Sequence, residues 1–589
     1  MGGGLIQLVA YGAQDLYLTG NPQITFFKVV YRRHTNFAIE SRRLVFNGTP
    51  NFDTTSVCNI LKGPDLLHKM YLEVEVNSGR IECDAITTFK SFRWLNWLGH
   101  LLIKKASFTI GGSEIDKHDG EWYHLLNELS QKSEKAEAYA EMVGNTPNLT
   151  QIHTTNKTES HNIINGEEAD YNFKLYIPLP FWFTKSPGLS LPIIALNHSD
   201  MTVEIEFEKL DNLVWGSSQT SAKFRAATGS DIFVTKPKFE NAYIYADYIY
   251  LDSDERKRFA QSAHEYLIEK LQIGSVQGSG STKDKILYNM NFTHPVKELI
   301  WVIKHTKFRD DKFTQSRCGK QPFNYTTQFD YTGFTGTPEP HTGVGMVGGR
   351  KAQNIWNGMA GVSLPYISNF IEPDLSEKFT NTGSKWMDDK ASKIISDTGL
   401  DTLKKLGYDR ISLYHPNPVD TGSVDPHSSK NVNRFIGNTA TIQDPSHTFT
   451  GVGDTHSKPY YGNWGTANGN NTRLLDQGKN PVSLAKLVLN GADRTSERDG
   501  FYYNVLVPYQ YHTSCPAPGI NAYSFAFEPE EHQPSGSCNF SRIDNASIEV
   551  TLDNEVGLNS GANVEMKTYA ISYNILRIMS GLGNVAYAN

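Results

Sequence analysis

The stretch "FTIGGSEIDKHDGEWY", from Phe108 to Tyr123, has a second version in this chain, "LVLNGADRTSERDGFYY", from Leu487 to Tyr503. Each version is an apolar, strand-like segment followed by a turn that contains glycine, then Asp-Gly and aromatic residues, with a one-residue difference in spacing. Glycine permits tight turns, and alternating apolar residues are typical of strands. An internal repeat of this kind predicts two copies of one structural unit.

The order of features after each copy strengthens this prediction. A proline-marked stretch comes first, "PLPFWFTKSPGLSLP" after one copy and "VPYQYHTSCPAPG" after the other. A strand with alternating acids then begins near Met201 and near Ala546. Since three features recur in the same order, we expect two β-sandwich domains of the same kind.

Period-two alternation supports an all-β fold. In "MYLEVEV", "TVEIEFE" and "SIEVTLD", which begin at Met70, Thr202 and Ser547, apolar residues alternate with polar or acidic ones. Such strands bury one face and expose the other, as in antiparallel sandwiches. The chain is also rich in Tyr, Phe, Gly and Asn, which favours strands and turns.

Helices are expected at few places. The best candidate is "DSDERKRFAQSAHEYLIEKLQ", from Asp252 to Gln272, which Asp252 can cap with Glu255 three residues on. A second helix is expected to start near Asp119, with an apolar side that includes Trp122 and Leu125. Neither alternates with strands as a doubly wound fold requires.

The predicted organisation has four parts. We expect an N-terminal arm at 1–24, a first sandwich at 25–250, a connecting helix at 251–275 and a second sandwich at 276–589. A chain of 589 residues is too long for one core, which agrees with two domains. The segment 306–480 is rich in Gly, Asn, Thr, Asp and Pro, so we expect a long surface insertion in the second sandwich.

Charge and cysteine content restrict the class of protein. The formal charge of −7 argues against a protein that coats nucleic acid, and the basic runs "YRRH" and "SRR" are short. Five scattered cysteines favour a reducing compartment and five free thiols. No Lys or Arg precedes Lys28, and the most apolar run, at 94–103, is half a membrane span, so we expect cytosolic synthesis without a spanning segment.

Several groups of residues suggest chemistry, and none is complete. Glu530, Glu531 and His532 allow acid–base catalysis, but adjacent acids flanked by prolines are more typical of an extended connection. "PSGSC", which contains Ser537 and Cys538, is not a nucleophile elbow. His118 and His124 lack a third metal ligand nearby, and "GVGMVGG" lacks the Lys of a phosphate-binding loop. The interpretation is therefore no enzyme, no cofactor and no metal.

The sequence contains nine N-x-S/T sequons. An Asn-rich chain gives several by chance, and ordinary secretory glycosylation is not expected without a signal peptide. If glycans are displayed on the surface insertion, Asn324 and Asn470 are the candidate sites.

Long segments at both ends resemble one known family. "GGLIQLVAYGAQDLYLTGNPQITFFKVVYRRHTNF" (3–37), "LYIPLPFWFTKSPGLSLPIIAL" (175–196), "YSFAFEPEEHQPSGSCNFSRIDN" (523–545) and "YAISYNILRIMSGLGNVAYAN" (569–589) resemble major capsid proteins of nucleocytoplasmic large DNA viruses, of the mimivirus and phycodnavirus type. So do 251–272 and "HPVKELIWVIK" (294–304). The insertion at 306–480 carries no such resemblance.

The resemblance implies fold and function together. The family's fold is a tandem double jelly roll, and three copies form a capsomer that tiles an icosahedral shell. The implied partners are two further copies of the chain, neighbouring capsomers, minor capsid proteins and an inner membrane, within virions assembled in the host cytoplasm. A minor capsid or spike protein of the same virions is the alternative, and a carbohydrate-binding jelly-roll protein is a more distant one.

Overall fold

The computed structural model describes most of the chain outside the long insertion. The described residues are 3–81, 88–150, 153–155, 172–220, 223–227, 233–279, 285–308, 321–327, 479–553 and 564–587. Within them, two antiparallel β-sandwiches follow one another along the chain, as expected from the repeat.

The first sandwich is built on two sets of four strands, which belong to one continuous nine-stranded sheet. In one set the neighbours run in the order β1 (Phe37–Asn47), β15 (Lys238–Leu251), β3 (Leu66–Asn77) and β9 (Asn172–Pro178). In the other the order is β2 (Thr55–Asn59), β11 (Met201–Phe207), β6 (Ile103–Ile110) and β7 (Ser113–His118). The end of β1 also pairs with β2, which joins the two sets at one corner.

The second sandwich repeats this arrangement strand for strand. Its first sheet has the order β16 (His264–Ile273), β26 (Val564–Met579), β19 (Pro295–His305) and β23 (Ile520–Ser524). Its second has β18 (Lys285–Met290), β25 (Ala546–Leu552), β20 (Val482–Leu489) and β21 (Ala492–Asp493). If the eight strands of each unit are numbered along the chain, both units have the orders 1-8-3-6 and 2-7-4-5. This is the jelly-roll order, so the fold is a double jelly roll. We call the two units the first roll and the second roll.

The other elements decorate the two rolls. The remaining strands are β4 (Arg80–Ile81), β5 (Thr88–Trp94), β8 (His153–Thr155), β10 (Leu191–Pro192), β12 (Val214–Thr220), β13 (Lys223–Ala227), β14 (Phe233–Thr235), β17 (Gln277–Ser279), β22 (Arg498–Asp499), β24 (Cys538–Asn539) and β27 (Leu582–Val585). Among the described residues, the α-helices are α1 (Gly3–Val9), α2 (Leu16–Thr19), α3 (Leu98–Leu102), α4 (Gly120–Ser130), α5 (Ser133–Met142), α6 (Pro147–Thr150), α7 (Ser253–Gln261) and α16 (Val507–Tyr511). Single-turn helices include η1 (Trp182–Thr184), η5 (Thr306–Phe308) and the π-helical η11 (Tyr502–Leu506).

The repeated sequence occupies the same place in both rolls. In the first roll it forms β6, a glycine turn, β7 and the start of α4, where Asp119 Oδ1 accepts a hydrogen bond from Trp122 N at 2.8 Å. In the second it forms β20, a turn, β21, β22 and the start of η11, where Asp499 Oδ1 accepts from Tyr502 N at 3.0 Å. Both aspartates cap a helix, which confirms the helix expected near Asp119.

The alternating strands bury the expected faces. In β3 the side chains of Leu72, Val74 and Val76 are buried, while the acids between them are half-buried. The corresponding side chains of β11 and β25 show the same alternation. Each roll has its own apolar cluster between its two sheets.

The connecting helix is shorter than predicted. Only Ser253–Gln261 is helical, and Asp252 caps it by accepting a hydrogen bond from Ser253 N. Residues 264–273 instead form strand β16, which pairs along its whole length with β26. The apolar spacing suits a helix, but pairing with a neighbouring strand and burial against both rolls override local preference.

The described parts of the predicted insertion are partly buried at its start and exposed at Lys479, near its end. Phe308 and Tyr325 are buried, and Thr327 N donates to the Lys479 carbonyl at 3.0 Å while Lys479 N donates to Thr327 Oγ1 at 3.1 Å. The prediction of a surface segment from residue 306 therefore does not hold for 325–327, which are buried. Residues 328–478 lie outside the described residues, and their outward placement stays a prediction.

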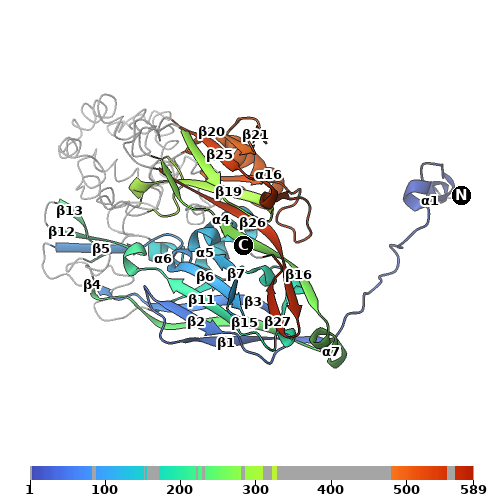
Figure 1. Cartoon of the computed structure of the whole chain (residues 1–589), viewed down its shortest axis with the longest axis horizontal. Coiled ribbons are helices and arrows are strands. Elements are labelled where there is room, and N and C mark those ends of the chain that lie inside the picture. Colours follow the sequence, from blue (N-terminus) through green and yellow to red (C-terminus); the bar gives the residue numbers. More distant parts are fainter. Residues whose placement is uncertain are drawn as a thin grey trace, which may run out of the picture.

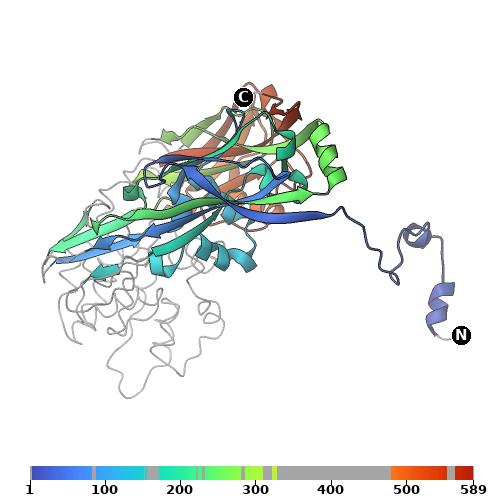
Figure 2. The same ribbon diagram turned by 90° about the horizontal axis from the view of Figure 1, so that it is seen from below.

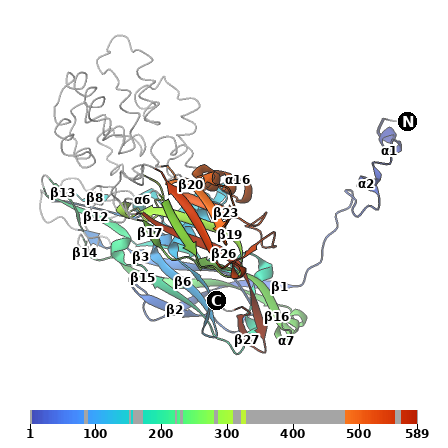
Figure 3. The ribbon, with the colours of Figure 1, turned by 45° about the horizontal axis from the view of Figure 1, so that its top comes forward.

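The N-terminal arm runs away from the two rolls (Figures 1 and 2). It contains α1, α2 and an extended stretch up to β1, and its apolar side chains are exposed. Figure 3 shows β19, β20 and β26 of the second roll above β3, β6 and β15 of the first.

Candidate functional site at the junction of the two rolls

The junction between the rolls brings together several buried and half-buried charged side chains. It is formed by α4 and β7 of the first roll and by the outer face of the β16–β26–β19–β23 sheet of the second. In that sheet, Leu299, Trp301 and Ile303 point into the core of the second roll. The alternate residues Ile300 and Val302 join the apolar cluster of the first roll, together with others in the same sheet: Ile268, Ile520, Tyr569 and Ile571. Both faces of this sheet are therefore buried, which fixes the two rolls as one body.

Two carboxylates at the start of α4 pair with two lysines of the second roll. Lys567 Nζ lies 2.6 Å from Asp119 Oδ2 and 3.3 Å from Glu121 Oε2. Lys304 Nζ lies 2.5 Å from Glu121 Oε1, and the Tyr569 hydroxyl donates to Glu121 Oε2 at 2.9 Å. Burial alone would raise the pKa of the Glu121 carboxyl, but Lys304 and Lys567 outweigh it and lower this pKa to about 2. The cluster ties the capped end of α4 to β19 and β26.

A second ionic cluster joins the rolls around Glu269 of β16. Lys185, which follows η1 in the first roll, pairs with Glu269 Oε2, and Lys297 Nζ of β19 lies 2.6 Å from Glu269 Oε1. Burial would raise the pKa of Glu269, but the two lysines outweigh it and lower the pKa below its usual value. Because Glu269 and Lys297 are buried, removing either one would leave an uncompensated buried charge.

The sequence candidate Glu530 contacts a histidine, but a different one from that expected. His512 Nδ1 lies 3.2 Å from Glu530 Oε1, and His512 Nε2 lies 3.4 Å from Glu298 Oε2. Burial would lower the pKa of His512, but the hydrogen bond to Glu530 and the charge of Glu298 outweigh it and raise the pKa. Glu530 also accepts hydrogen bonds from Thr513, which locks the loop that carries it against the end of α16. Sequence reasoning missed His512 and Glu298, which are distant from Glu530 along the chain.

The remaining sequence candidates lie in structural contacts. His118 Nε2 is 3.1 Å from Asp116 Oδ2, and the ring of His124 stacks on Phe323 with 4.4 Å between centroids. Within the described ranges no group of three His, Cys, Asp or Glu side chains could hold a metal ion. Burial raises the pKa of the Cys538 thiol, which disfavours a reactive thiolate. "GVGMVGG" lies outside the described residues.

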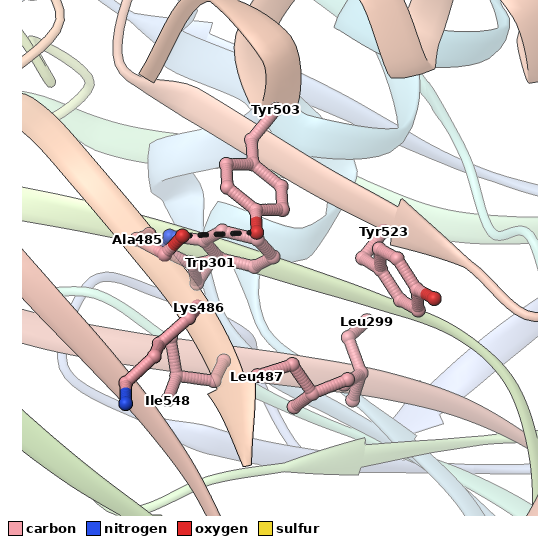
Figure 4. Close-up of a pocket in the computed structure, with 8 residues that line it drawn as sticks. All are labelled: Leu299, Trp301, Ala485, Lys486, Leu487, Tyr503, Tyr523 and Ile548. Atoms are coloured by element: carbon pink, nitrogen blue, oxygen red, sulfur yellow. Dashed lines mark hydrogen bonds between the residues drawn. The ribbon is translucent and has the colours of Figure 1, made fainter. Parts of the chain in front are cut away.

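Two cavities in the described part of the chain differ in kind. A cleft of about 410 Å³ beside the first turn of α4 is lined by groups of both charges, among them Asp119, Glu121 and Lys304, which pair within the junction cluster. A cavity of about 10 Å³ lies in the core of the second roll, below the hydrogen bond from the Tyr503 hydroxyl to the Ala485 carbonyl (Figure 4). It is near the lower limit for one water molecule, so we interpret it as a packing gap.

The candidate glycosylation sites are only partly described. Asn324 lies half-buried in a turn, where its Nδ2 donates to Gln321 Oε1 at 2.6 Å and its Oδ1 accepts from Thr326 N at 2.9 Å. Asn470 lies outside the described residues. Glycosylation at either site stays a prediction.

Of the five cysteines, Cys58, Cys515 and Cys538 are described, and these three are free thiols. The described helices include none that is long and apolar enough to cross a membrane.

Comparisons with known proteins agree with this architecture. Residues 25–252 match the family described as the major capsid protein N-terminus, and residues 255–360 and 420–584 match the large eukaryotic DNA virus major capsid protein. The chain is 36% identical to the major capsid protein of Phaeocystis pouchetii virus and 33% identical to capsid protein 1 of Acanthamoeba polyphaga mimivirus, in each case over 100% of both chains.

Solved structures show the same fold. A quasi-atomic model of the PBCV-1 virus capsid matches with a TM-score of 0.56 and 24% identity, covering 96% of this chain and 100% of that one. The Faustovirus major capsid protein matches with a TM-score of 0.55 and 12% identity, covering 97% and 94%. The resemblance inferred from the sequence is confirmed, and the chain belongs to the family of major capsid proteins of large eukaryotic DNA viruses.

Proposed function

We propose that three copies of this capsid protein form a capsomer with a pseudo-hexagonal outline, and that such capsomers tile an icosahedral shell. The observation that carries the proposal is the identical strand order of the two rolls. Three chains then supply six like units around a threefold axis, and six like units pack in a hexagonal array. Contacts around such a ring are head-to-tail and closed, as cyclic symmetry requires.

The junction supports a structural role. Its buried and half-buried carboxylates are neutralised by lysines from the other roll, which holds the two rolls in one fixed orientation. A rigid pair of rolls is what a repeating shell needs, because each capsomer must present the same edges to its neighbours. We infer that the protein works as a building unit without a catalytic centre, a cofactor or direct binding of nucleic acid.

We place the N-terminal arm on the inner side of the shell. Apolar side chains of the arm, including Leu8, Tyr17, Phe26 and Phe27, are exposed in the single chain. A surface of this kind suits burial against a minor capsid protein or an inner membrane beneath the shell. Protease added to intact virions should then spare the arm, and early cleavage before Lys28 would contradict this placement. We also propose that the capsid assembles in the host cytoplasm.

The test of the capsomer is the mass and shape of the purified protein. Sedimentation should give a particle of three times the chain mass of 66.0 kDa, and negative-stain images should show threefold particles with a hexagonal outline. A protein that stays monomeric at all concentrations, or forms only dimers, would overturn the proposal. It would then favour a minor capsid or spike role.

A further inference from the structure

The first sheets of the two rolls are equivalent, but their outer faces differ in exposure. In the second roll this face is covered by the first roll, and Ile300, Val302 and Tyr569 are buried there. In the first roll the same face of the β1–β15–β3–β9 sheet is uncovered in the single chain. It carries half-exposed tyrosines and exposed aliphatic side chains: Tyr71, Tyr176, Tyr243, Tyr245, Ile39 and Val45. We call these six residues the tyrosine face.

The helices that follow the two copies of the repeated sequence also differ in exposure, but here the helix of the first roll is covered and that of the second roll is exposed. In the first roll, α4 buries Trp122 and Leu125, and the Trp122 ring lies 5.8 Å from that of Tyr569 across the junction. In the second roll, η11 and α16 occupy the equivalent place after Asp-Gly, but Phe501, Leu506 and Tyr509 are 66%, 40% and 76% exposed. We call these three residues the helical knob. An uncovered sheet face in one roll thus matches an uncovered apolar helix in the other.

We propose that the helical knob of one copy docks on the tyrosine face of a second copy, repeating between chains the contact that α4 makes with the second roll within the chain. This inference rests on the proposed trimer and names the surfaces that form it. Figure 1 shows β1 and β15 at the opposite end of the two stacked rolls from β20, β21 and α16. The two surfaces are therefore different patches at separate ends of the chain, as a head-to-tail contact requires.

The free edge of β1 supports the same contact. Residues Phe37–Val45 pair only with β15, so the other edge of this strand is open among the described residues. The equivalent strand β16 has its edge against β7 of the first roll, where Leu271 N donates to Asp116 Oδ1 at 3.5 Å. The corresponding neighbour of β1 would be the β21–β22 side of the second copy. An open edge with apolar neighbours is a site for contact with another chain.

Chemistry on the two sides is complementary. The guanidinium of Arg43 on β1 lies over the Tyr243 ring at 4.7 Å and remains exposed. The opposing side of the second roll carries the exposed carboxylates of Asp493, which also pairs with Lys486 at 3.2 Å, and of Asp499, whose Oδ1 caps η11. Tyrosine-rich faces and aromatic anchors are also the residue types enriched at protein interfaces. A second copy of this chain therefore satisfies both surfaces at once.

Interchain crosslinking tests the proposal directly. One preparation carries Tyr509→Cys and another carries Tyr245→Cys, and the two are mixed, reassembled and oxidised. We expect disulfide-linked dimers of chains only in the mixture. Each variant alone and the unsubstituted protein serve as controls, because they show any crosslinking through the native Cys515 and Cys538. Absence of the mixed product in particles that sediment as trimers would overturn the proposed surfaces and leave the trimer intact.

A charge substitution gives an independent readout. Tyr509→Glu should raise the trimer dissociation constant by about tenfold or more, because a buried aromatic anchor is replaced by a desolvated carboxylate. Leu287→Glu on β18, which is also exposed in the single chain but lies outside both surfaces, should leave the constant unchanged. Circular dichroism and thermal unfolding of each monomer confirm that the chain still folds. Equal trimer stability in the two variants would refute the inference, whereas an unsubstituted protein that never forms trimers would refute the proposed function instead.

Discussion

The two Asp-Gly turns of this protein have the same backbone role and different side-chain surroundings. Asp119 and Asp499 both cap a helix, and a Cβ added to Gly120 or Gly500 would lie 2.0 Å from a carbonyl oxygen, that of His100 or Val482. The next residue is Glu121 in one roll and Phe501 in the other. Glu121 pairs with lysines of the second roll, whereas Phe501 is exposed. The shared residues specify the roll, and the residue that differs specifies what the roll contacts.

The largest expected effect comes from the shared glycines. Gly120→Ala and Gly500→Ala each force a methyl group against a backbone carbonyl, that of His100 in α3 or of Val482 in β20. Each substitution should therefore lower the free energy of unfolding by about 3 kcal/mol, the upper end of the usual cost of overpacking. The measurement is the urea midpoint of the purified protein. Gly188→Ala, where no atom lies within 4 Å of the added Cβ, is the matched control and should change stability by less than about 1 kcal/mol. Similar midpoints for all three variants would show that the turns tolerate a side chain.

A smaller effect is expected where the two turns differ. Glu121→Ala leaves Lys304 and Lys567 without their shared carboxylate. Breaking a buried ion pair lowers the free energy of unfolding by about 3 kcal/mol, and the loss is somewhat smaller here because the site is partly exposed. The matched control is Glu114→Ala, because Glu114 pairs with Lys105 on the surface of the same roll, at 3.1 Å. Surface pairs contribute about 0.5 kcal/mol. If both variants unfold at the same urea concentration, the junction cluster does not hold the rolls together.

The same carboxylate gives the junction a dependence on pH. The pKa of Glu121 is lowered from 4.5 to about 2 in the folded chain, so the unfolded chain binds this proton first as the pH falls. The stabilisation from Glu121 is therefore complete above pH 4.5 and is lost as the pH falls towards 2. Urea midpoints of the unsubstituted protein and of Glu121→Gln should converge over this window. A constant difference between them down to pH 2 would contradict the ion-pair assignment.

The capping aspartates should give a still smaller and unequal effect. Asp499→Ala removes one cap at an exposed site and should cost about 1 kcal/mol. Asp119→Ala should cost more, because Asp119 also contacts Lys567 at 2.6 Å. Serine at each position keeps a capping oxygen but removes the charge. Asp499→Ser should therefore recover most of the loss, whereas Asp119→Ser should recover only the capping part.

Sequence patterns were sufficient to predict elements of the two rolls, because strand alternation and helix capping depend on residues that are close together in the chain. Alternation predicted β3, β11 and β25, and Asp119 before an apolar stripe predicted α4. The pattern failed at residues 264–273, where apolar spacing suited a helix but pairing with β26 made a strand. Local preference cannot report a partner that lies about three hundred residues away.

The junction was not predictable from the sequence for the same reason. Glu121, Lys304 and Lys567 come from three distant segments, and nothing in any one segment marks it as part of a cluster. One signal was nevertheless present. The two copies of the repeat differ directly after Asp-Gly, with Glu121 in one and Phe501 in the other. A departure between copies of a repeat indicates a different neighbour, even when it does not identify that neighbour.

The connection between the third and fourth strands gives the last and smallest expected effect. In the first roll this connection, between β3 and β6, contains β5 and α3, and Leu98 and Leu102 of α3 are buried. In the second roll it is the long insertion between β19 and β20. Its described base is closed where Thr327 and Lys479 exchange hydrogen bonds of 3.0 and 3.1 Å.

Because the two ends of the insertion already meet at that base, a short linker can join them. Replacing residues 333–471 by a short Gly/Ser linker should leave the trimer intact and change monomer stability by no more than about 1 kcal/mol, since the cost of closing a loop varies only with the logarithm of its length. Sedimentation measures the trimer, and the urea midpoint measures the monomer. The control is Thr327→Ala, which removes the hydroxyl that accepts from Lys479 N and keeps the insertion. Folded monomers that no longer form trimers would show that the insertion clamps a neighbouring copy, and trimers that persist would show that the two rolls alone carry the assembly.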